Sequence, residues 1–544
     1  MLNQNQTPLL DAIISNAKRP HAAFYTPGHK QGKGISSKLI NYFGNSIFKA
    51  DLTELTELDC LFAPEGVIQQ AQQLAAEAFG ASQTWFLVNG STCGIEAAIL
   101  ATCCDRDKII LPRNVHSSVI SGLILSGAIP IFINPEYDTN LDIAHSITIE
   151  SLSKALQKHP DAKAVMMVYP TYYGVCGDIK TIAELTHKYN IPLIVDEAHG
   201  SHFAFHPELP ISALAAGADL TVQSIHKTLG AMTQASMLHI QGERININHL
   251  NKSLQLTQST SPSYILLASL DAARQQIAIH GKELLTRTLQ LAEEARNQIN
   301  QIPGFSVNWF PDSGWEPIEQ RLCLQKLNKR QSLLECIPSL ETGNEKCIPS
   351  LETGNEKSLE TGNEKTGYEN QNFPLILDNT RLTAIVSELG ITGFEAEEIL
   401  DEKFNVTPEF ASLETVTFII SLGNTESDIE LLVKAFKTLA LEFKKPLLEK
   451  KRSSWNIPEL NILELSPRQA FFSSTETVPI HKAINRISAE TVCPYPPGIP
   501  LLIPGEKISS AVVEHLLNVK AMGGFISNCA DSSLSTLKVV IGSG

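Results

Sequence analysis

Three polar motifs in the chain carry residue types that can bind or transform a small molecule. They are Asn89–Thr92 (NGST), Asp196 and Ser224–Lys227 (SIHK), and each directly follows a short apolar run. A glycine followed by the hydroxyls of Ser91 and Thr92, ahead of a helix, offers backbone N–H groups and side-chain donors to a phosphate. The plainer alternative is an ordinary helix N-cap, because Ser and Thr are common at that position.

Asp196 and Lys227 could act on the rest of such a ligand. An acid directly after an apolar strand can face a ligand, although it could also be a structural carboxylate that caps a nearby loop. A lysine at this depth in a sheet loses basicity through desolvation and becomes nucleophilic toward a carbonyl group. The alternative for Lys227 is an exposed loop lysine, so each motif taken alone is ambiguous.

Taken together, the three motifs supply what pyridoxal phosphate requires. They provide a phosphate cradle, an acid for the pyridine nitrogen and a lysine that can hold the cofactor as a Schiff base. His116, in the motif RNVHSS, follows another apolar run of the same region and would supply a flat ring to stack on the cofactor. A lone histidine is more often structural, but the position of this one matches the other three motifs.

These motifs need a scaffold that brings them together, and the residues between Thr84 and Ile240 predict one. Short apolar runs alternate there with helix-like stretches, which predicts an α/β fold with a doubly wound, mostly parallel sheet. Ligands of such sheets bind at the carboxyl ends of the strands. The expected strands are Thr84–Val88, Lys108–Leu111, Ile129–Ile133, Ala164–Val168, Ile191–Val195, Asp219–Gln223 and Ser236–Ile240, and the expected helices include Cys93–Cys104, Ser117–Ser126 and Asp178–Tyr189.

Composition narrows the class of protein. The chain has 544 residues, of which 43% are hydrophobic and 19% charged, as in soluble globular proteins of more than one domain. A net charge of -15 argues against a nucleic-acid partner. The ten cysteines form no CxxC pair, so we expect neither a disulfide framework nor a metal site. No signal peptide or membrane segment is recognisable, which predicts a cytoplasmic protein without a membrane partner.

Several longer motifs resemble the Orn/Lys/Arg decarboxylases, in their short bacterial form, within the fold type I pyridoxal-phosphate superfamily. The motifs run in order over nearly the whole chain. They are FYTPGHKQG (Phe24–Gly32), DLTELTELDCLFAPEG (Asp51–Gly66), NGST, RNVHSS, YPTYYGVCGD (Tyr169–Asp178), DEAHGSHFAFHP (Asp196–Pro207), QSIHKTLGAMTQ (Gln223–Gln234) and PYPPGIPLLIPGE (Pro494–Glu506). The resemblance implies a fold type I major domain followed by a smaller C-terminal α+β domain.

The resemblance also implies a role for each matching residue. Lys227 would hold the cofactor, Asp196 would keep the pyridine nitrogen protonated, and His116 would stack on the ring. The phosphate would be bound by Ser91, Thr92 and Ser224, and the pocket would be lined by His199 and His226. Glu506, in the proline-rich loop, would meet the distal cation of the substrate; the alternative is that it caps a following helix at Lys507–Asn518.

The implied reaction is the removal of the α-carboxylate of arginine, lysine or ornithine as CO2, with Lys227 or His226 returning a proton to Cα. The sequence does not choose among the three substrates. Another fold type I activity, such as an aminotransferase or an aldolase, remains an alternative, as does a catalytically silent cofactor-binding or regulatory protein. Because the family works as homodimers with active sites at the interface, we expect a homodimer or higher homo-oligomer, with Asp51–Gly66 near that interface.

The expected domains are an N-terminal arm at 1–50, a pyridoxal-phosphate major domain at 51–327, an insertion at 328–372 and a C-terminal domain at 373–544. The last contains a predicted strand at Thr415–Ile420 and a predicted helix at Glu426–Phe443. The insertion repeats CIPSLETGNEK at Cys336–Lys346 and Cys347–Lys357, with a shortened copy at Ser358–Lys365. This unit is too short for a solenoid and lacks a face to stack, so we predict an exposed, disordered and dispensable loop. A partner-binding linker is the alternative.

Deleting Cys336–Lys365 should leave activity and solubility unchanged. The deletion shortens a loop of roughly 40 residues to about 10, which by loop-closure entropy should raise the free energy of unfolding by about 1 kcal/mol. Denaturant unfolding and steady-state kinetics of the deletion variant check this. A large loss of activity would show that the repeat is structural.

Overall fold

The structure is a computed structural model, and it describes residues 2–138, 141, 143–307, 375–443, 462–495 and 498–542. The predicted loop at Cys336–Lys365 lies outside the described residues. Within the described part of the chain, no helix is both long and apolar enough to cross a membrane.

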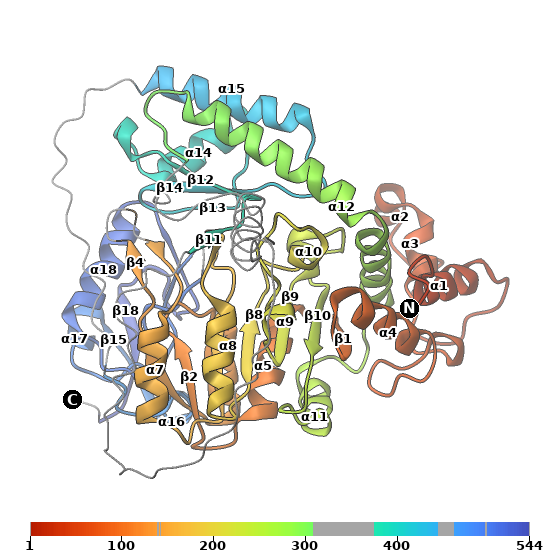
Figure 1. Cartoon of the computed structure of the whole chain (residues 1–544), viewed down its shortest axis with the longest axis horizontal. Coiled ribbons are helices and arrows are strands. Elements are labelled where there is room, and N and C mark those ends of the chain that lie inside the picture. The colour runs from red at the N-terminus through yellow and green to blue at the C-terminus, as the bar shows by residue number, and fades with distance from the viewer. Residues whose placement is uncertain are drawn as a thin grey trace, which may run out of the picture. The chain divides into compact units, whose positions relative to one another are not determined.

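A seven-stranded sheet organises the first 307 residues (Figure 1). Its strand order is β1-β10-β9-β8-β6-β2-β3; strands β9, β8, β6, β2 and β3 are parallel, and β10 is antiparallel to both of its neighbours. The predicted α/β, mostly parallel sheet is therefore confirmed. The strands are β1 (Gln83–Leu87), β2 (Lys108–Pro112), β3 (Ile129–Ile133), β6 (Ala164–Val168), β8 (Leu193–Asp196), β9 (Leu220–Gln223) and β10 (Ser236–Ile240).

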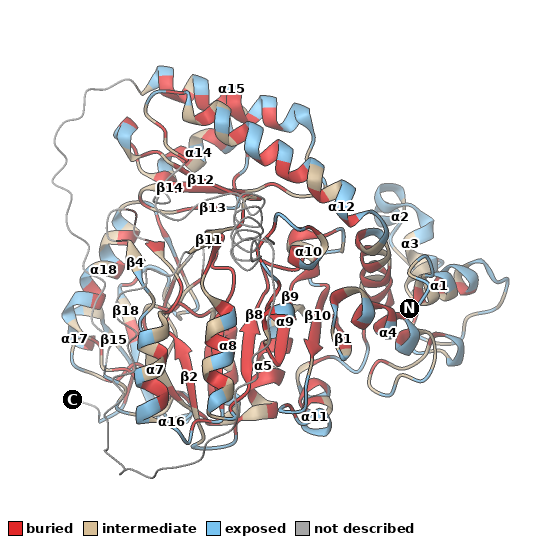
Figure 2. Ribbon diagram, in the orientation of Figure 1, coloured by how far each residue is buried: buried red, intermediate tan, exposed pale blue. Residues whose placement is uncertain are grey.

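The sheet is buried on both faces, as the apolar runs require (Figure 2). Successive strand residues enter two different cores: Val165 and Met167 of β6 belong to one, while Met166 and Val168 belong to the other. Helices α1, α4, α7, α8 and α12 contribute to the first core, and α5, α6 and α11 to the second. These helices are α1 (Pro8–Lys18), α4 (Val67–Phe79), α5 (Gly90–Thr102), α6 (Ser117–Ser126), α7 (Ile149–Lys158), α8 (Ile179–Lys188), α11 (Ile247–Thr257) and α12 (Tyr264–Asn300).

The N-terminal segment is anchored through buried charges rather than through the sheet. Asp271 of α12 accepts hydrogen bonds from the backbone N–H groups of Leu9 and Leu10, and Arg274 donates to the carbonyls of Gln4 and Gln6. Two further helices of this segment, α2 (Ser37–Phe43) and α3 (Asn45–Ala50), have no buried residue.

The residues after 375 form two smaller cores. In the first, β12 (Arg381–Ile385), β13 (Phe410–Ala411) and β14 (Thr415–Ile419) pack with α14 (Gly393–Phe404), α15 (Glu426–Glu442) and the last turns of α12. The strand and helix predicted here are confirmed. The second core is formed by β15 (Thr475–Pro479), α17 (Ile480–Ala483), α18 (Ser510–Ala521), β17 (Phe525–Ser527) and β18 (Thr536–Val540).

Short elements complete the described chain. The proline-rich stretch, predicted to be an extended loop, contains a three-residue strand, β16 (Cys493–Tyr495), that pairs with β17. The remaining elements are η1 (Thr56–Leu58), β4 (Tyr137–Asp138), β5 (Ile143–Ala144), β7 (Val175–Cys176), η2 (Phe203–Phe205), α9 (Ala213–Ala216), α10 (Ile225–Thr228), β11 (Ile376–Leu377), η3 (Ser387–Leu389) and α16 (Pro467–Phe472).

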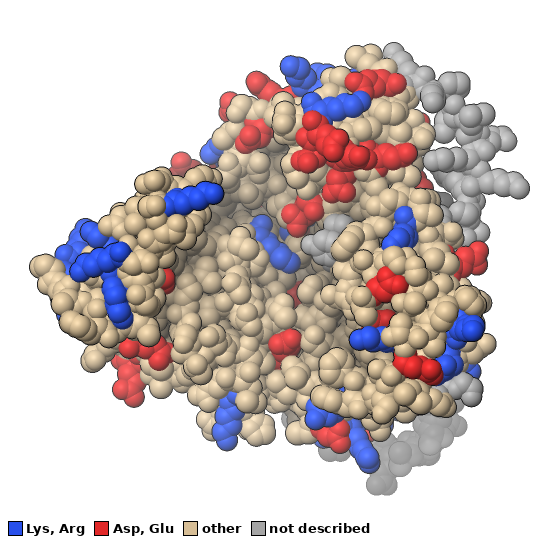
Figure 3. All heavy atoms as spheres, turned by 180° about the vertical axis from the view of Figure 1, so that it is seen from behind, with Lys and Arg blue, Asp and Glu red and all other residues tan. Residues whose placement is uncertain are grey.

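The surface charge agrees with the acidic composition. On the face shown in Figure 3, Asp and Glu side chains gather over the upper part, where α14 lies, and Lys and Arg side chains are scattered. The acidic residues of α14 are Glu395, Glu397, Glu398, Asp401 and Glu402. This face offers no basic stripe that a phosphate backbone would need.

Candidate active site

The predicted site residues come from neighbouring parallel strands. Asp196 is the last residue of β8, Lys227 lies in the short helix α10 directly after β9, and His116 precedes α6 after β2. Strands β9, β8, β6 and β2 are consecutive in the sheet, so their carboxyl ends meet at one edge. Asp196, Lys227 and His116 are therefore placed at the same edge, where Lys227 also contacts His199.

Lys227 is paired with a histidine rather than with an acid. Its Nζ lies 3.0 Å from Nε2 of His199. Burial lowers the pKa of Lys227; the charge of Asp196 opposes this shift, and the charge of Arg381 adds to it. A lysine with a lowered pKa carries a larger fraction of the neutral amine, which is the nucleophilic form.

His199 connects Lys227 to a buried arginine. Its Nδ1 lies 2.8 Å from the guanidinium NH2 of Arg381, a side chain that is 1% exposed. Burial, followed by the charges of Lys227 and Arg381, holds the pKa of His199 well below its usual value, so the ring is neutral. A guanidinium can only donate, so Nδ1 of His199 must accept and the ring proton must sit on Nε2. Nε2–H then points at Nζ of Lys227, and the lysine accepts this hydrogen bond in its neutral form.

Asp196 is a buried carboxylate without an ion pair of its own among the described residues. Its Oδ1 accepts one hydrogen bond, from the backbone N–H of Ala198 at 3.1 Å. Burial raises the pKa of Asp196, and the nearby charge of Lys227 opposes this shift. A buried carboxylate with this little compensation is suited to a cationic N–H donor, such as a protonated pyridine nitrogen.

The proposed phosphate cradle lies at the start of α5. Ser91 and Thr92 lie in the first turn of α5, so the plainer N-cap alternative is wrong for them: the N-cap residue is Asn89, whose side chain makes no capping hydrogen bond. The first backbone N–H groups of a helix have no partner within it. Ser224 is fully buried, and its Oγ has no hydrogen-bond partner in the described structure. An unpaired buried hydroxyl beside a helix N-terminus fits a phosphate ligand.

Two further histidines, His116 and His226, lie near Lys227. His116 is the N-cap of α6: its Nδ1 accepts from the backbone N–H of Ser118 at 3.2 Å. Burial and the charge of Lys227 lower the pKa of His116 to about 4, so its ring is neutral near pH 7. His226 lies 2.9 Å, through Nδ1, from the carbonyl oxygen of Ala235. Burial lowers the pKa of His226, and its neutral Nε2 can take up and return a proton.

These residues fit pyridoxal phosphate in each of its three parts. The cradle suits the phosphate, Asp196 suits the pyridine nitrogen, and the unprotonated amine of Lys227 suits the aldehyde carbon.

Comparisons with known proteins agree with this assignment. The family profile described as Orn/Lys/Arg decarboxylase, major domain, matches residues 7–428, and the profile of that family's C-terminal domain matches residues 457–525. The chain belongs to this family. The family is pyridoxal-phosphate-dependent and decarboxylates basic amino acids, so the predicted enzyme class is confirmed and the aminotransferase and aldolase alternatives are not supported.

Similar proteins cover almost the whole chain. The arginine decarboxylase of Bacillus anthracis is 38% identical over 539 residues, which make up 99% of this chain and 98% of that one. The arginine decarboxylase of Bacillus subtilis is 36% identical over 99% of each chain. The constitutive lysine decarboxylase of Escherichia coli is 25% identical over 95% of this chain and 78% of that one. The crystal structure of Francisella novicida lysine decarboxylase shares the fold, with a TM-score of 0.76, 22% identity and coverage of 98% of this chain and 80% of that chain.

The structure adds site residues that the sequence did not reveal. Arg381 opens β12, and its neighbour Asp378 is fully buried 3.3 Å from Nε2 of His202. Tyr172, inside one of the family motifs, packs its ring against that of His199 at 5.4 Å between centroids. A local D-x-x-R pattern was the only sequence signal for Asp378 and Arg381, because their partners are far away in the chain: Arg381 meets His199 across 182 positions, and Asp378 meets His202 across 176.

Glu506 has a protein partner. It is 1% exposed; both carboxylate oxygens lie 3.2 Å from the NH2 of Arg113, and Oε2 accepts from the backbone N–H of Ile503. The helix-cap alternative is wrong, because α18 begins at Ser510 and Ser509 is its N-cap. The role of Glu506 toward the substrate stays a prediction, and it must be tested against this ion pair.

Replacing Arg381 with Met should slow the capture of pyridoxal phosphate by the cofactor-free enzyme at pH 7. Without the arginine, Nδ1 of His199 can hold the proton, and Nε2 can accept from a protonated Lys227. A charge-assisted hydrogen bond is worth about 1.5–3 kcal/mol, so we expect about tenfold slower capture or more, with the pH profile moved to higher pH.

Stopped-flow absorbance of cofactor capture between pH 6 and 10 measures this profile. Arg381→Lys is the matched control, because it keeps a buried cationic donor and should stay closer to the wild-type profile. Melting curves establish that both variants are folded. A folded Arg381→Met enzyme with an unshifted profile would contradict the proton assignment.

Proposed function

We propose that this enzyme decarboxylates arginine to agmatine and CO2. The observation that supports arginine is the level of identity: the arginine decarboxylases of Bacillus anthracis and Bacillus subtilis are 36–38% identical over 99% of this chain, and the Escherichia coli lysine decarboxylase is 25% identical. Such a difference over full-length chains favours the arginine-type pocket over the lysine-type pocket.

In this proposal Lys227 holds the cofactor until the substrate amine replaces it. Nζ of Lys227 would hold the cofactor at its aldehyde carbon, and the pair with His199 would favour the neutral, nucleophilic form of this amine. Ser91, Thr92 and Ser224 would bind the phosphate, Asp196 would keep the pyridine nitrogen protonated, and His116 would supply a ring to stack on the cofactor. Pyridoxal phosphate, when bound, supplies an electron sink for the electron pair left at Cα when CO2 departs.

The chain's own residues complete the proton balance. The released Lys227 amine would carry a proton after exchange with the substrate, and His226 could instead deliver a proton that its Nε2 has first taken up. Either group returns one proton to Cα, which gives the amine product. His199 is buried and Lys227 is partly buried, which favours delivery of this proton by a side chain.

The assembly and location proposed for this enzyme follow the family. A homodimer with active sites at the interface is supported by the exposed aromatic side chains of the N-terminal segment: Phe24 is 93% exposed and Tyr42 is 83% exposed. A cytoplasmic location is supported by cysteines that are all unpaired among the described residues.

Borohydride reduction of the wild-type holoenzyme should fix the cofactor on one peptide, the one that contains Lys227. Lys227→Ala should give no reduced adduct, while Lys282→Ala, an exposed lysine of α12, should give the wild-type result. Peptide mass spectrometry identifies the adduct. An adduct on another lysine in the wild type would overturn the assignment.

Incubation of the holoenzyme with equal concentrations of arginine, lysine and ornithine should release CO2 and chiefly agmatine. Product amines and keto acids are quantified together. Cadaverine or putrescine as the main product would refute the arginine proposal, and keto acids without CO2 would refute decarboxylation by this chain.

Glu506→Gln tests the substrate role against the ion pair. If Glu506 also meets the distal cation of the substrate, loss of a charge-assisted hydrogen bond worth about 1.5–3 kcal/mol should lower kcat/KM for arginine roughly 10- to 150-fold. The variant should also melt earlier, because Arg113, whose side chain is 14% exposed, loses its partner. A lower Tm with unchanged kcat/KM would assign Glu506 to structure alone.

A further inference from the structure

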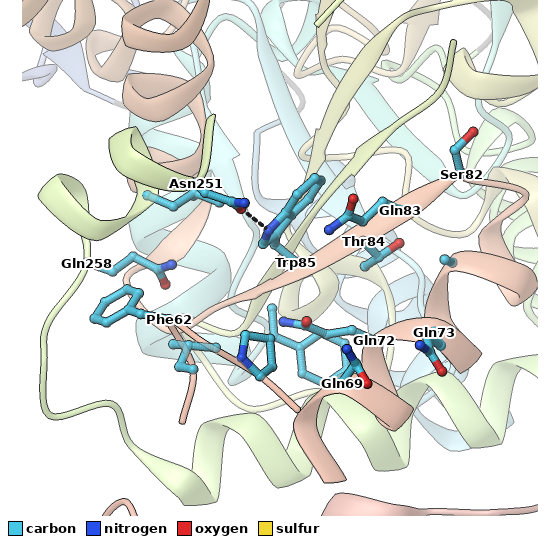
Figure 4. A pocket seen from close by; sticks show the side chains of 15 residues that line it. Phe62, Gln69, Gln72, Gln73, Ser82, Gln83, Thr84, Trp85, Asn251 and Gln258 are labelled. Atoms are coloured by element: carbon cyan, nitrogen blue, oxygen red, sulfur yellow. Dashed lines mark hydrogen bonds between the residues drawn. The ribbon is translucent and has the colours of Figure 1, made fainter. Parts of the chain in front are cut away.

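A pocket of about 370 Å³ lies at the β1 edge of the sheet and shares no residue with the site around Lys227. It is bordered by α4, β1 and the C-terminal end of α11, and Figure 4 shows Gln72, Trp85, Asn251 and Gln258 around the same space. None of its lining residues among those described is acidic, basic or a histidine. A basic amino acid or a diamine would need a carboxylate, and a phosphate ester would need a cation, so the lining suits neither.

The pocket contains an unsatisfied buried amide. Gln72 of α4 is 6% exposed, and its Nε2 has no hydrogen-bond partner in the described structure. Leaving a buried amide unpaired destabilises the folded state, so such a group needs an explanation. A ligand that pairs with the carboxamide of Gln72 supplies one.

In two other side-chain amides, those of Asn251 and Gln258, the hydrogen bonds show which atom is the oxygen and which is the nitrogen. The indole Nε1–H of Trp85 donates to Oδ1 of Asn251 at 2.8 Å, and the backbone N–H of Val88 donates to Oε1 of Gln258 at 3.0 Å. Indole and backbone N–H groups can only donate, so the bound amide atoms must be oxygens. The NH2 groups of Asn251 and Gln258 therefore remain as donors toward a ligand.

Aromatic rings complete the lining. Trp85 and Phe62 both border the pocket, and the hydrogen bond to Asn251 fixes the indole in place. Aromatic side chains stack on planar heterocycles, nucleic-acid bases included. The pocket thus combines two aromatic side chains, the two NH2 groups of Asn251 and Gln258, and the carboxamide of Gln72.

We propose that this pocket binds a small uncharged planar heterocycle with a lactam edge, of the hypoxanthine or uracil class. The lactam N–H and C=O would pair with the carboxamide of Gln72, and further ring acceptors would receive the NH2 groups of Asn251 and Gln258. The ring would lie against Trp85. A phosphorylated form of the same compound would gain no charged contact in the lining.

Titration calorimetry of the holoenzyme with hypoxanthine and with uracil tests the proposal. We expect at least one of them to bind, and to bind at least tenfold more tightly than inosine monophosphate. Gln72→Met should weaken this binding at least tenfold and should keep or raise Tm, because it removes an unpaired buried amide while preserving the shape of the side chain. Trp85→Phe, which keeps a ring, is a second variant that should also weaken binding.

Gln70→Met is the matched control, since Gln70 lies on the same helix, is exposed and does not line the pocket. Its affinity for the heterocycle should equal that of the wild type. The proposal is overturned if neither compound binds at millimolar concentration, or if Gln70→Met and Gln72→Met reduce binding equally. Tight binding of inosine monophosphate with no binding of the free base would also overturn it.

Discussion

The guanidinium of Arg381 can donate hydrogen bonds but cannot accept them, and the state of the active-site lysine depends on this. Because Nδ1 of His199 must accept from Arg381, the ring proton goes to Nε2 and Lys227 receives it as a neutral amine. Close to Arg381 in the sequence, Asp378 contacts His202 and accepts a hydrogen bond from the hydroxyl of Thr380. This cluster helps to fix the position of Arg381. The chemistry that the cofactor requires of Lys227 is therefore set by a residue from beyond the central sheet.

Two parts of the chain contribute residues to the candidate active site. The parallel strands bring Asp196, Lys227 and His116 to one edge, since the carboxyl ends of neighbouring strands must coincide there. Strand β12, with Arg381, and the loop with Glu506 approach this region from the residues after 375. Arg113, which follows β2, pairs with Glu506 and so connects the last part of the chain to the sheet. Assembly of the site thus requires both parts to be folded.

The sheet and the residues at its edge could be predicted from the sequence, because each strand is a largely apolar run and the polar residues follow it directly. Apolar runs identify strands that are buried on both faces, and three of the seven, including Ile129–Ile133, match their predicted bounds. The misplaced ends have physical reasons. Strand β8 begins after Pro192, which lacks a backbone N–H, and β1 ends before Val88, whose N–H bonds to the side chain of Gln258.

Long-range pairs could not be predicted in the same way. Nothing near Arg381 in the sequence indicates His199 as its partner, and nothing near Glu506 indicates Arg113. Each pair joins residues 182 or more positions apart, and only the packing of separate elements brings them together. The family resemblance gave Glu506 a substrate role but could not indicate the arginine that already holds it. The roles of the predicted site residues accordingly rest on experiments such as adduct mapping.

A buried chain of hydrogen bonds runs from the pocket at the β1 edge to Glu197, the neighbour of Asp196 in the sequence. Thr84 lines the pocket at the β1 edge, and its Oγ1 lies 2.7 Å from Nδ1 of His239. Nε2 of His239 lies 3.2 Å from Oε1 of Gln223. Gln223 donates through Nε2 to Glu197, the neighbour of Asp196. Burial lowers the pKa of His239 to about 3, so its ring is neutral; Nε2–H can then donate to Gln223, and Nδ1 can accept from the hydroxyl of Thr84.

All donors in this chain therefore point toward Glu197. Burial raises the pKa of Glu197 to about 8, while the N–H groups of Gln223 and Ala213, which stabilise its carboxylate, lower it. The chain crosses β1, β10, β9 and the end of β8 in their spatial order, and a buried polar network of this kind tolerates no shift of one strand against the next. The strand register that places Asp196 beside Lys227 is thus stabilised by hydrogen bonds that extend to β1, at the edge of the sheet where the pocket lies.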